Sequence, residues 1–198
     1  MRALLFLLPV SAMAQVICAL GSGAPAYQPS ADQRPASDAM QLAGRVNDAE
    51  KSICGSNCPI VALFRNSTAP NAALIVNAGQ PKLVYAPQFF ATLYDGYGDP
   101  GIVAVIAHEL GHALDDTMGA AWINAAWTPE LRADSWAGCT LAKAGFGPND
   151  LRQAFSALSK YPSAAHPGWN RRVPALRSGF THCGGTAATF EAAVRQGK

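Results

Sequence analysis

Two histidines and a glutamate lie together in the middle of an apolar stretch, in the order His108-Glu109-Leu110-Gly111-His112. Residues four apart on an α-helix lie one turn apart and about 40° around its axis, so the two imidazoles point toward one spot. This spacing is typical of two zinc ligands, and Glu109, offset by about 100°, can reach a water on the metal without binding it. Burying these polar groups in an apolar helix is costly without a task, so the pattern predicts a catalytic zinc site.

A catalytic zinc ion takes three protein ligands and a water, and this motif supplies two. One class of enzymes adds a third histidine further along the same helix, but Asp115 and Met118 occupy the required positions here. The next helix offers Glu130 and Asp134, four apart and on one face. Glu130 is well placed as the ligand; one of the two acids can bind the metal while the other fixes the tautomer of a ligand histidine. The small Ala133 between them lets the two helices approach closely.

The helices that must position these residues are marked by cap-then-proline pairs. Asp99-Pro100 predicts the start of a buried helix that runs to about Gly119. Thr128-Pro129 repeats the signature and predicts a helix to about Lys143, closed by Gly145. Breakers and periodicity predict further helices over 39–52, 87–93, 150–158 and 170–178.

Three short runs of β-type residues precede the histidine helix, over 60–64, 73–76 and 82–86, with Gly79-Gln80-Pro81 as a turn between the last two. They predict a small antiparallel or mixed sheet. The expected fold class is therefore α+β, with this sheet packed on a helical core that carries two ligand-bearing helices.

The N-terminus has the features of an export signal. A positive start, an apolar run over 3–10 and Ala12-Met13-Ala14 predict a signal peptide over 1–14, with cleavage as late as Gly23 left open and a buried N-terminal element as the alternative. Residues 15–38 are expected to form a flexible linker and 39–198 a single domain. No later stretch is apolar enough for a membrane span, so we expect no stable membrane insertion after signal removal and a periplasmic or secreted protein.

Cysteine usage agrees with export, because thiols oxidise outside the cytoplasm. Cys54 pairs naturally with Cys58 across a tight loop, and Cys139 with Cys183, which leaves Cys18 over. A zinc site on the first pair is the competing idea, but no second ligand pair accompanies it. The net charge of only +2 gives no reason to expect nucleic acid as a partner.

Three segments together resemble the gluzincin peptidases of the CAAX prenyl protease and HtpX-like group, and the soluble bacterial neutral zinc metallopeptidases related to it. They are the motif at 108–112, Glu130-Leu-Arg-Ala-Asp134 and His166-Pro-Gly-Trp-Asn-Arg-Arg172. The resemblance covers roughly residues 70–180. Glu130 follows the motif more closely than in the membrane-embedded members, which fits the compact soluble relatives, and Pro174 departs from the pattern in the helix after His166.

The resemblance implies that the helical core is zincin-like, and it implies roles for residues outside the first motif. Glu130 would be the third ligand, His166 would face the substrate carbonyl as it becomes an oxyanion, and Arg172 would orient the site. His182 and Tyr161 are the alternative oxyanion donors. A segment over Asn71, Ala72 and Ala73 resembles the group's edge strand, which pairs with an extended peptide.

The expected function is that of an exported zinc-dependent endopeptidase with one zinc ion and a peptide or protein substrate. Zinc would lower the pKa of its bound water toward about 7, and Glu109 would take the proton during attack and pass it to the leaving amine. Two alternatives stay open: an inactive zinc-binding or peptide-binding relative, recognised by a fourth ligand such as Asp115 or Asp116, and an intracellular peptidase of the antirepressor-cleaving type. The sequence does not indicate an oligomeric state.

Overall fold

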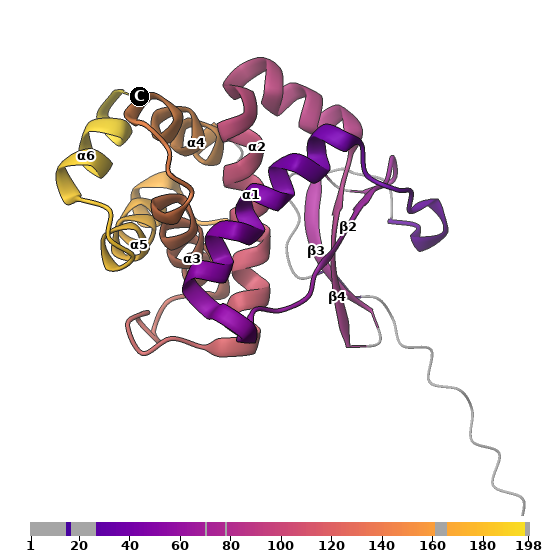
Figure 1. Cartoon of the computed structure of the whole chain (residues 1–198), viewed down its shortest axis with the longest axis horizontal. Helices are drawn as coiled ribbons and strands as arrows, with labels where there is room; N and C mark the ends of the chain where they lie inside the picture. Colours follow the sequence, from indigo (N-terminus) through magenta and orange to yellow (C-terminus); the bar gives the residue numbers. More distant parts are fainter. Residues whose placement is uncertain (1–14, 17–26, 70, 78, 161–165, 197–198) are drawn as a thin grey trace, which may run out of the picture.

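Figure 1 shows the long helix α2 between a small sheet and the remaining helices, with α1 crossing in front of it. The structure is a computed structural model of the chain and describes residues 15–16, 27–69, 71–77, 79–160 and 166–196. The strands are β1 (Gln15–Val16), β2 (Ala62–Arg65), β3 (Ala72–Asn77) and β4 (Gln80–Tyr85). The helices are α1 (Ser37–Cys54), α2 (Pro87–Met118), α3 (Pro129–Lys143), α4 (Pro148–Lys160), α5 (Trp169–His182) and α6 (Ala187–Gln196).

The sheet has the strand order β1-β3-β4-β2 and is mixed. β3 and β4 form an antiparallel hairpin in which Asn77 lies opposite Gln80, whereas β2 runs parallel to β4. The predicted fold class, α+β with an antiparallel or mixed sheet on a helical core, is confirmed. Residues 72–75 of β3 are buried on both faces, because α2 packs on one face and Phe64 and Tyr27 cover part of the other.

The backbone of α2 is interrupted at Gly98, so α2 consists of two helical segments. Gly98 has φ 61° and ψ −162°, which breaks the helix at the predicted breaker, directly before Asp99-Pro100. Beyond that point residues 101–114 are buried without exception, as an apolar helix at the centre of the molecule must be. The histidine motif therefore lies in the least exposed element of the fold.

Several expected boundaries moved. α1 is two residues longer at each end than predicted, and α5 continues through Pro174 to His182, since only one backbone N–H is lost there and the helix is held by its packing on α3. α6 was not predicted. The α3 start lies at Thr128-Pro129 as expected, but the Thr128 side chain makes no capping hydrogen bond.

Part of the predicted linker contacts the sheet. Asp32 receives hydrogen bonds from the side chains of Tyr27, Asn66 and Lys82, and Gln33 forms an antiparallel bridge with Arg65 at the edge of β2. Residues 15–16 form β1 against β3. The predicted signal peptide and Cys18 lie outside the described residues. No helix among those described combines the length and apolarity that crossing a bilayer requires.

Candidate metal centre

The two ligand-bearing helices cross at a glycine. A Cβ on Gly111 of α2 would lie 2.6 Å from the carbonyl oxygen of Ala133 on α3, closer than atoms in contact can be. Ala133 is fully buried at this crossing, as its small size predicted. The Gly within the histidine motif is therefore required by backbone contact, a role that the sequence analysis missed although a glycine inside a buried helix is the usual signal for it.

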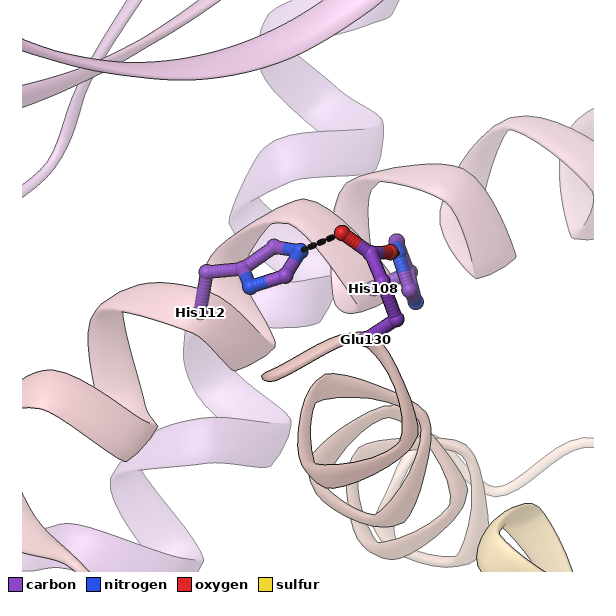
Figure 2. A group of neighbouring side chains, drawn as sticks. All are labelled: His108, His112 and Glu130. Carbon is purple, nitrogen blue, oxygen red and sulfur yellow. Dashed lines mark ion pairs between the residues drawn. The ribbon is translucent and has the colours of Figure 1, made fainter. Parts of the chain in front are cut away.

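This crossing brings His108, His112 and Glu130 together. Figure 2 shows the two imidazoles of α2 and the carboxylate of α3 pointing toward one another, and one donor atom from each lies within 4.8 Å of the others. The Nε2 atom of His108 is 3.4 Å from Glu130 Oε2, and Nε2 of His112 is 3.8 Å from Glu130 Oε1. All three side chains are buried. The predicted trio of ligands is thus assembled in one place.

The donor set fits a metal ion on two counts. Four ligands arranged tetrahedrally about zinc are about 3.3 Å apart for bonds of about 2.0 Å, which is close to both distances from Glu130. The Nε2 atom of His112 is buried and has no hydrogen-bond partner among the described residues. A buried imidazole nitrogen without a partner is costly, and a metal ion would satisfy it. The group can therefore hold a metal ion, whose identity the geometry alone does not fix.

A second layer of polar contacts orients His108. Its Nδ1 lies 2.9 Å from Asp134 Oδ1, so Nδ1–H donates to the carboxylate and Nε2 is directed at Glu130. Arg172 of α5 binds Asp134 through Nε at 2.9 Å and Nη2 at 2.7 Å, and its Nη1 donates to the carbonyl oxygen of Leu158. This is the division of labour that the spacing of Glu130 and Asp134 predicted, with Asp134 as the acid that fixes the tautomer.

The position of α5 depends on two further glycines. A Cβ on Gly179 would lie 1.7 Å from the carbonyl oxygen of Ser135, and one on Gly138 would lie 2.1 Å from that of Leu176. The α3 and α5 backbones therefore touch, which places the buried Arg172 against Asp134. The Cys139–Cys183 disulfide joins the same two helices near their C-terminal ends.

His166 joins the cluster, as the resemblance implied. Its Nε2 lies 2.9 Å from Glu130 Oε2 and 3.1 Å from His108 Nε2, and the side chain is buried. One alternative donor, His182, lies away from the site, where it stacks on Trp122 at a ring distance of 4.5 Å near the C-terminal end of α3. The other, Tyr161, lies outside the described residues.

The charges in this cluster shift one another's pKa values. Burial opposes protonation of His108, but hydrogen bonds to Asp134 and Glu130 outweigh it and raise its pKa to about 9. Burial alone would raise the pKa of Asp134, yet Arg172 and His108 lower it to about 2. The acid that holds the ligand histidine is therefore ionised at neutral pH.

The remaining imidazoles are driven toward the neutral form. Burial and the charge on His108 lower the pKa of His112 to about 3, and burial also lowers the pKa of His166. The pKa of Glu130 falls well below its usual range, since its hydrogen bonds to His108 and His166 outweigh its burial. His112 and Glu130 are therefore in the protonation states that bind metal, whereas His108 must release a proton from Nε2 when a metal ion binds.

Glu109 connects α2 to the sheet. Its side chain is fully buried and Oε2 accepts the backbone N–H of Leu74 at 2.8 Å. In the hairpin register the backbone N–H and C=O groups of Ala73 and Ile75 point toward β4. The backbone N–H of Leu74 therefore points away from β4, to the side where β1 pairs with Ile75 and Val76. The side of β3 that faces away from β4 therefore adjoins the glutamate of the motif.

The predicted edge segment over Asn71, Ala72 and Ala73 is the start of this strand. Asn71 has a positive φ of 51° directly before β3, and the other two are its first residues and are buried. β3 is second in the sheet order, because β1 covers its far end. The predicted segment is brought near the motif, with Ala72 and Ala73 buried and Asn71 partly exposed.

The residues proposed as a closing fourth ligand lie elsewhere. Asp115 accepts a hydrogen bond from Arg132 Nε at 2.7 Å, and Asp116 is exposed.

Both predicted disulfides are present, Cys54–Cys58 and Cys139–Cys183, which fits an oxidising environment. Comparisons with protein-family models, with curated proteins and with solved structures found no match for this chain.

Proposed function

We propose that the chain is an exported zinc endopeptidase of the gluzincin type, with His108, His112 and Glu130 as the ligands. The observation that carries the proposal is the convergence of these buried side chains beside a motif glutamate that reaches the backbone of β3. Two imidazoles and one carboxylate are a ligand set that hydrolytic enzymes use to bind zinc. The two disulfides support export to an oxidising compartment.

The mechanism assigns one task to each residue. A zinc ion bound there supplies a Lewis acid that polarises the substrate carbonyl and acidifies a water. Glu109 takes the proton of the attacking water and delivers it to the leaving amine. His166, next to Glu130 and His108, donates to the carbonyl oxygen as negative charge develops on it. Asp134 and Arg172 hold His108 in the required tautomer.

The substrate is an extended peptide that pairs with β3. Support comes from β1, which pairs antiparallel with Ile75 and Val76 and so demonstrates the kind of segment that this side of the strand accepts. The backbone N–H of Leu74, now bonded to Glu109, is the next group along that side. A substrate backbone would lie within reach of the motif glutamate there.

The test is peptide hydrolysis together with metal content for Glu109→Gln. We expect this variant to keep one zinc ion per chain and to lose at least about a hundredfold in kcat on a mixed peptide library, because the proton acceptor is gone. Asp116→Asn removes an exposed acid from the same helix and should leave both quantities unchanged. Full activity of a zinc-loaded Glu109→Gln protein would contradict the mechanism.

A second candidate is a closed, structural metal site with His166 as a fourth ligand. The short distances from His166 Nε2 to Glu130 and His108 favour it. His166→Gln separates the two: a catalytic donor loses kcat but keeps the metal, whereas a fourth ligand loses the metal. A wild-type protein that holds zinc but cleaves no peptide of the library would favour the structural site.

A further inference from the structure

A pocket lies on the side of α2 away from the metal centre. It has a volume of about 460 Å³ and is bounded by α1, β2, β4 and α2. From α2 it receives Ile106 and Leu110, each two residues from a ligand histidine and so on roughly the opposite face of the helix. Other walls are formed by Ala43, Leu63 and Leu83, so the pocket is mostly apolar.

One acidic side chain interrupts these apolar walls. Glu50 of α1 lines the pocket and is only 5% exposed, and its Oε1 has no hydrogen-bond partner among the described residues. The other polar residues of the lining, Arg34 and Asn47, are exposed at its rim. A buried carboxyl group without a partner is destabilising, which is a reason to look for a ligand that completes it.

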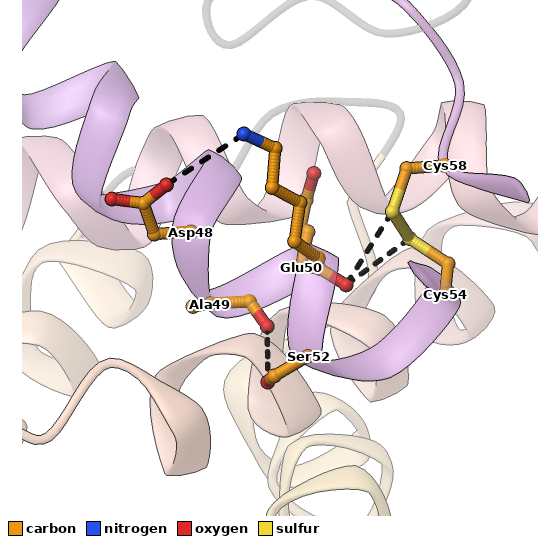
Figure 3. Close-up of a disulfide and its surroundings, with 7 residues drawn as sticks. Asp48, Ala49, Glu50, Ser52, Cys54 and Cys58 are labelled. Atoms are coloured by element: carbon orange, nitrogen blue, oxygen red, sulfur yellow. Dashed lines mark hydrogen bonds and ion pairs between the residues drawn. A yellow bond between two sulfur atoms is a disulfide. The ribbon is translucent and has the colours of Figure 1, made fainter. Parts of the chain in front are cut away.

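The position of Glu50 is fixed by the disulfide that follows it. Figure 3 shows both sulfurs of Cys54–Cys58 against the main-chain carbonyl oxygen of Glu50, at 3.1 Å and 3.6 Å. A disulfide has no S–H, so these are packing contacts that hold the last turn of α1 in place. Burial raises the pKa of the Glu50 carboxyl to about 8. The disulfide thus holds the backbone that carries Glu50, and the carboxyl group lines the pocket without a counter-charge.

We propose that this pocket binds an aliphatic primary amine, with its hydrocarbon chain along the apolar walls and its ammonium group at Glu50. An ammonium group offers three donors and the positive charge that Glu50 lacks, and an aliphatic chain matches Ile106, Leu110 and Leu83. The same chemistry occurs in a free alkylamine and in the side chain of a lysine.

Calorimetric titration with n-hexylamine tests the proposal on the intact chain. We expect saturable binding to the wild type and binding weakened at least about tenfold in Glu50→Gln, which keeps the shape of the side chain but cannot ionise when the ammonium group binds. Asp48→Asn is the matched control, since Asp48 is an exposed acid on the same helix whose loss leaves the pocket intact. Hexan-1-ol, which has the same chain without the charge, should bind more weakly than the amine.

A second variant blocks the pocket without touching Glu50. A Cβ on Gly44, which lines the pocket, meets no atom within 4 Å, so Gly44→Phe can be accommodated and should abolish hexylamine binding in a folded protein. Titration with Nα-acetyl-lysine N-methylamide decides the source: binding that depends on Glu50 assigns the pocket to lysine side chains, and its absence assigns it to free amines. No binding of hexylamine to the wild type, or equal binding to Glu50→Gln, overturns the proposal.

Discussion

Two of the acidic side chains buried beside α2, Asp134 and Glu50, have opposite environments. Asp134 lies in the junction of α2, α3 and α5, where Arg172 and His108 surround its carboxylate and hold its pKa near 2. Glu50 lies behind α2, where no partner meets Oε1 among the described residues and its pKa rises to about 8. The same residue chemistry therefore yields a fixed charge in one region and a nearly neutral acid in the other.

The difference shows what each region is built for. The junction around Asp134 is complete within the chain, since every polar group there that orients a ligand histidine is supplied by a neighbouring helix. The pocket around Glu50 is incomplete and its remaining partner must come from outside the chain. Changes at matched positions in the two regions should therefore have opposite effects on stability.

The largest effect is expected from Arg172→Met. This change leaves the Asp134 charge buried without its main partner, which costs about 3–5 kcal/mol of unfolding free energy. Arg177→Met is the control on the same helix, because Arg177 pairs with Glu191 in a half-exposed ion pair worth about 0–1 kcal/mol. Urea unfolding of both variants measures the difference. Equal losses would show that Asp134 does not depend on Arg172.

The second effect is a pH dependence that Glu50→Gln removes. Glu50 has a folded-state pKa of about 8, above its usual value of 4.5, so the folded state keeps a proton that the unfolded chain releases between these pH values. Its favourable contribution is complete below pH 4.5 and is lost as pH rises toward 8. Glu50→Gln should therefore gain about 2–3 kcal/mol relative to the wild type between pH 5 and pH 7.

Unfolding free energies of the two proteins at several pH values provide the measurement. The difference between the two proteins at each pH isolates Glu50, because all other titrating groups are common to both chains. A difference that stays constant from pH 5 to pH 8 would mean that Glu50 titrates normally in the folded state.

The smallest effects are expected at two glycines. Gly111→Ala pushes a methyl group into the carbonyl oxygen of Ala133 and should lower the unfolding free energy by about 1–3 kcal/mol. The same change should weaken metal binding, because it moves the two ligand-bearing helices apart. Gly44→Ala fills open space within α1 and should stabilise the protein by about 0.5–1 kcal/mol. Thermal unfolding of the two variants measures both, and a stabilising Gly111→Ala would contradict the close crossing of α2 and α3.

The metal centre was predictable from sequence where its geometry is local. His108 and His112 share a helix, and Glu130 and Asp134 share another, so spacing alone indicated which side chains converge and that one acid orients a histidine. The meeting of His166 with Glu130 depends on packing between helices distant in sequence. Only the resemblance to a peptidase family pointed to it.

The pocket around Glu50 could not be predicted from the sequence, for a physical reason. Glu50 lies in an amphipathic helix where a glutamate normally faces solvent, and its burial arises from how α1 packs on α2 and α3. The parallel pairing of β2 with β4 also has no local signal, because β3 intervenes in the chain. Local patterns thus identified the elements and the ligands, while their tertiary contacts required the structure.

The most direct test of the account is the metal content of purified protein after dialysis, measured by mass spectrometry for the wild type, His112→Gln and His182→Gln. We predict one zinc ion per chain in the wild type and in His182→Gln, whose histidine stacks on Trp122 away from the site, and none in His112→Gln. A wild-type chain without metal, or a His112→Gln chain that retains it, would contradict the proposed centre.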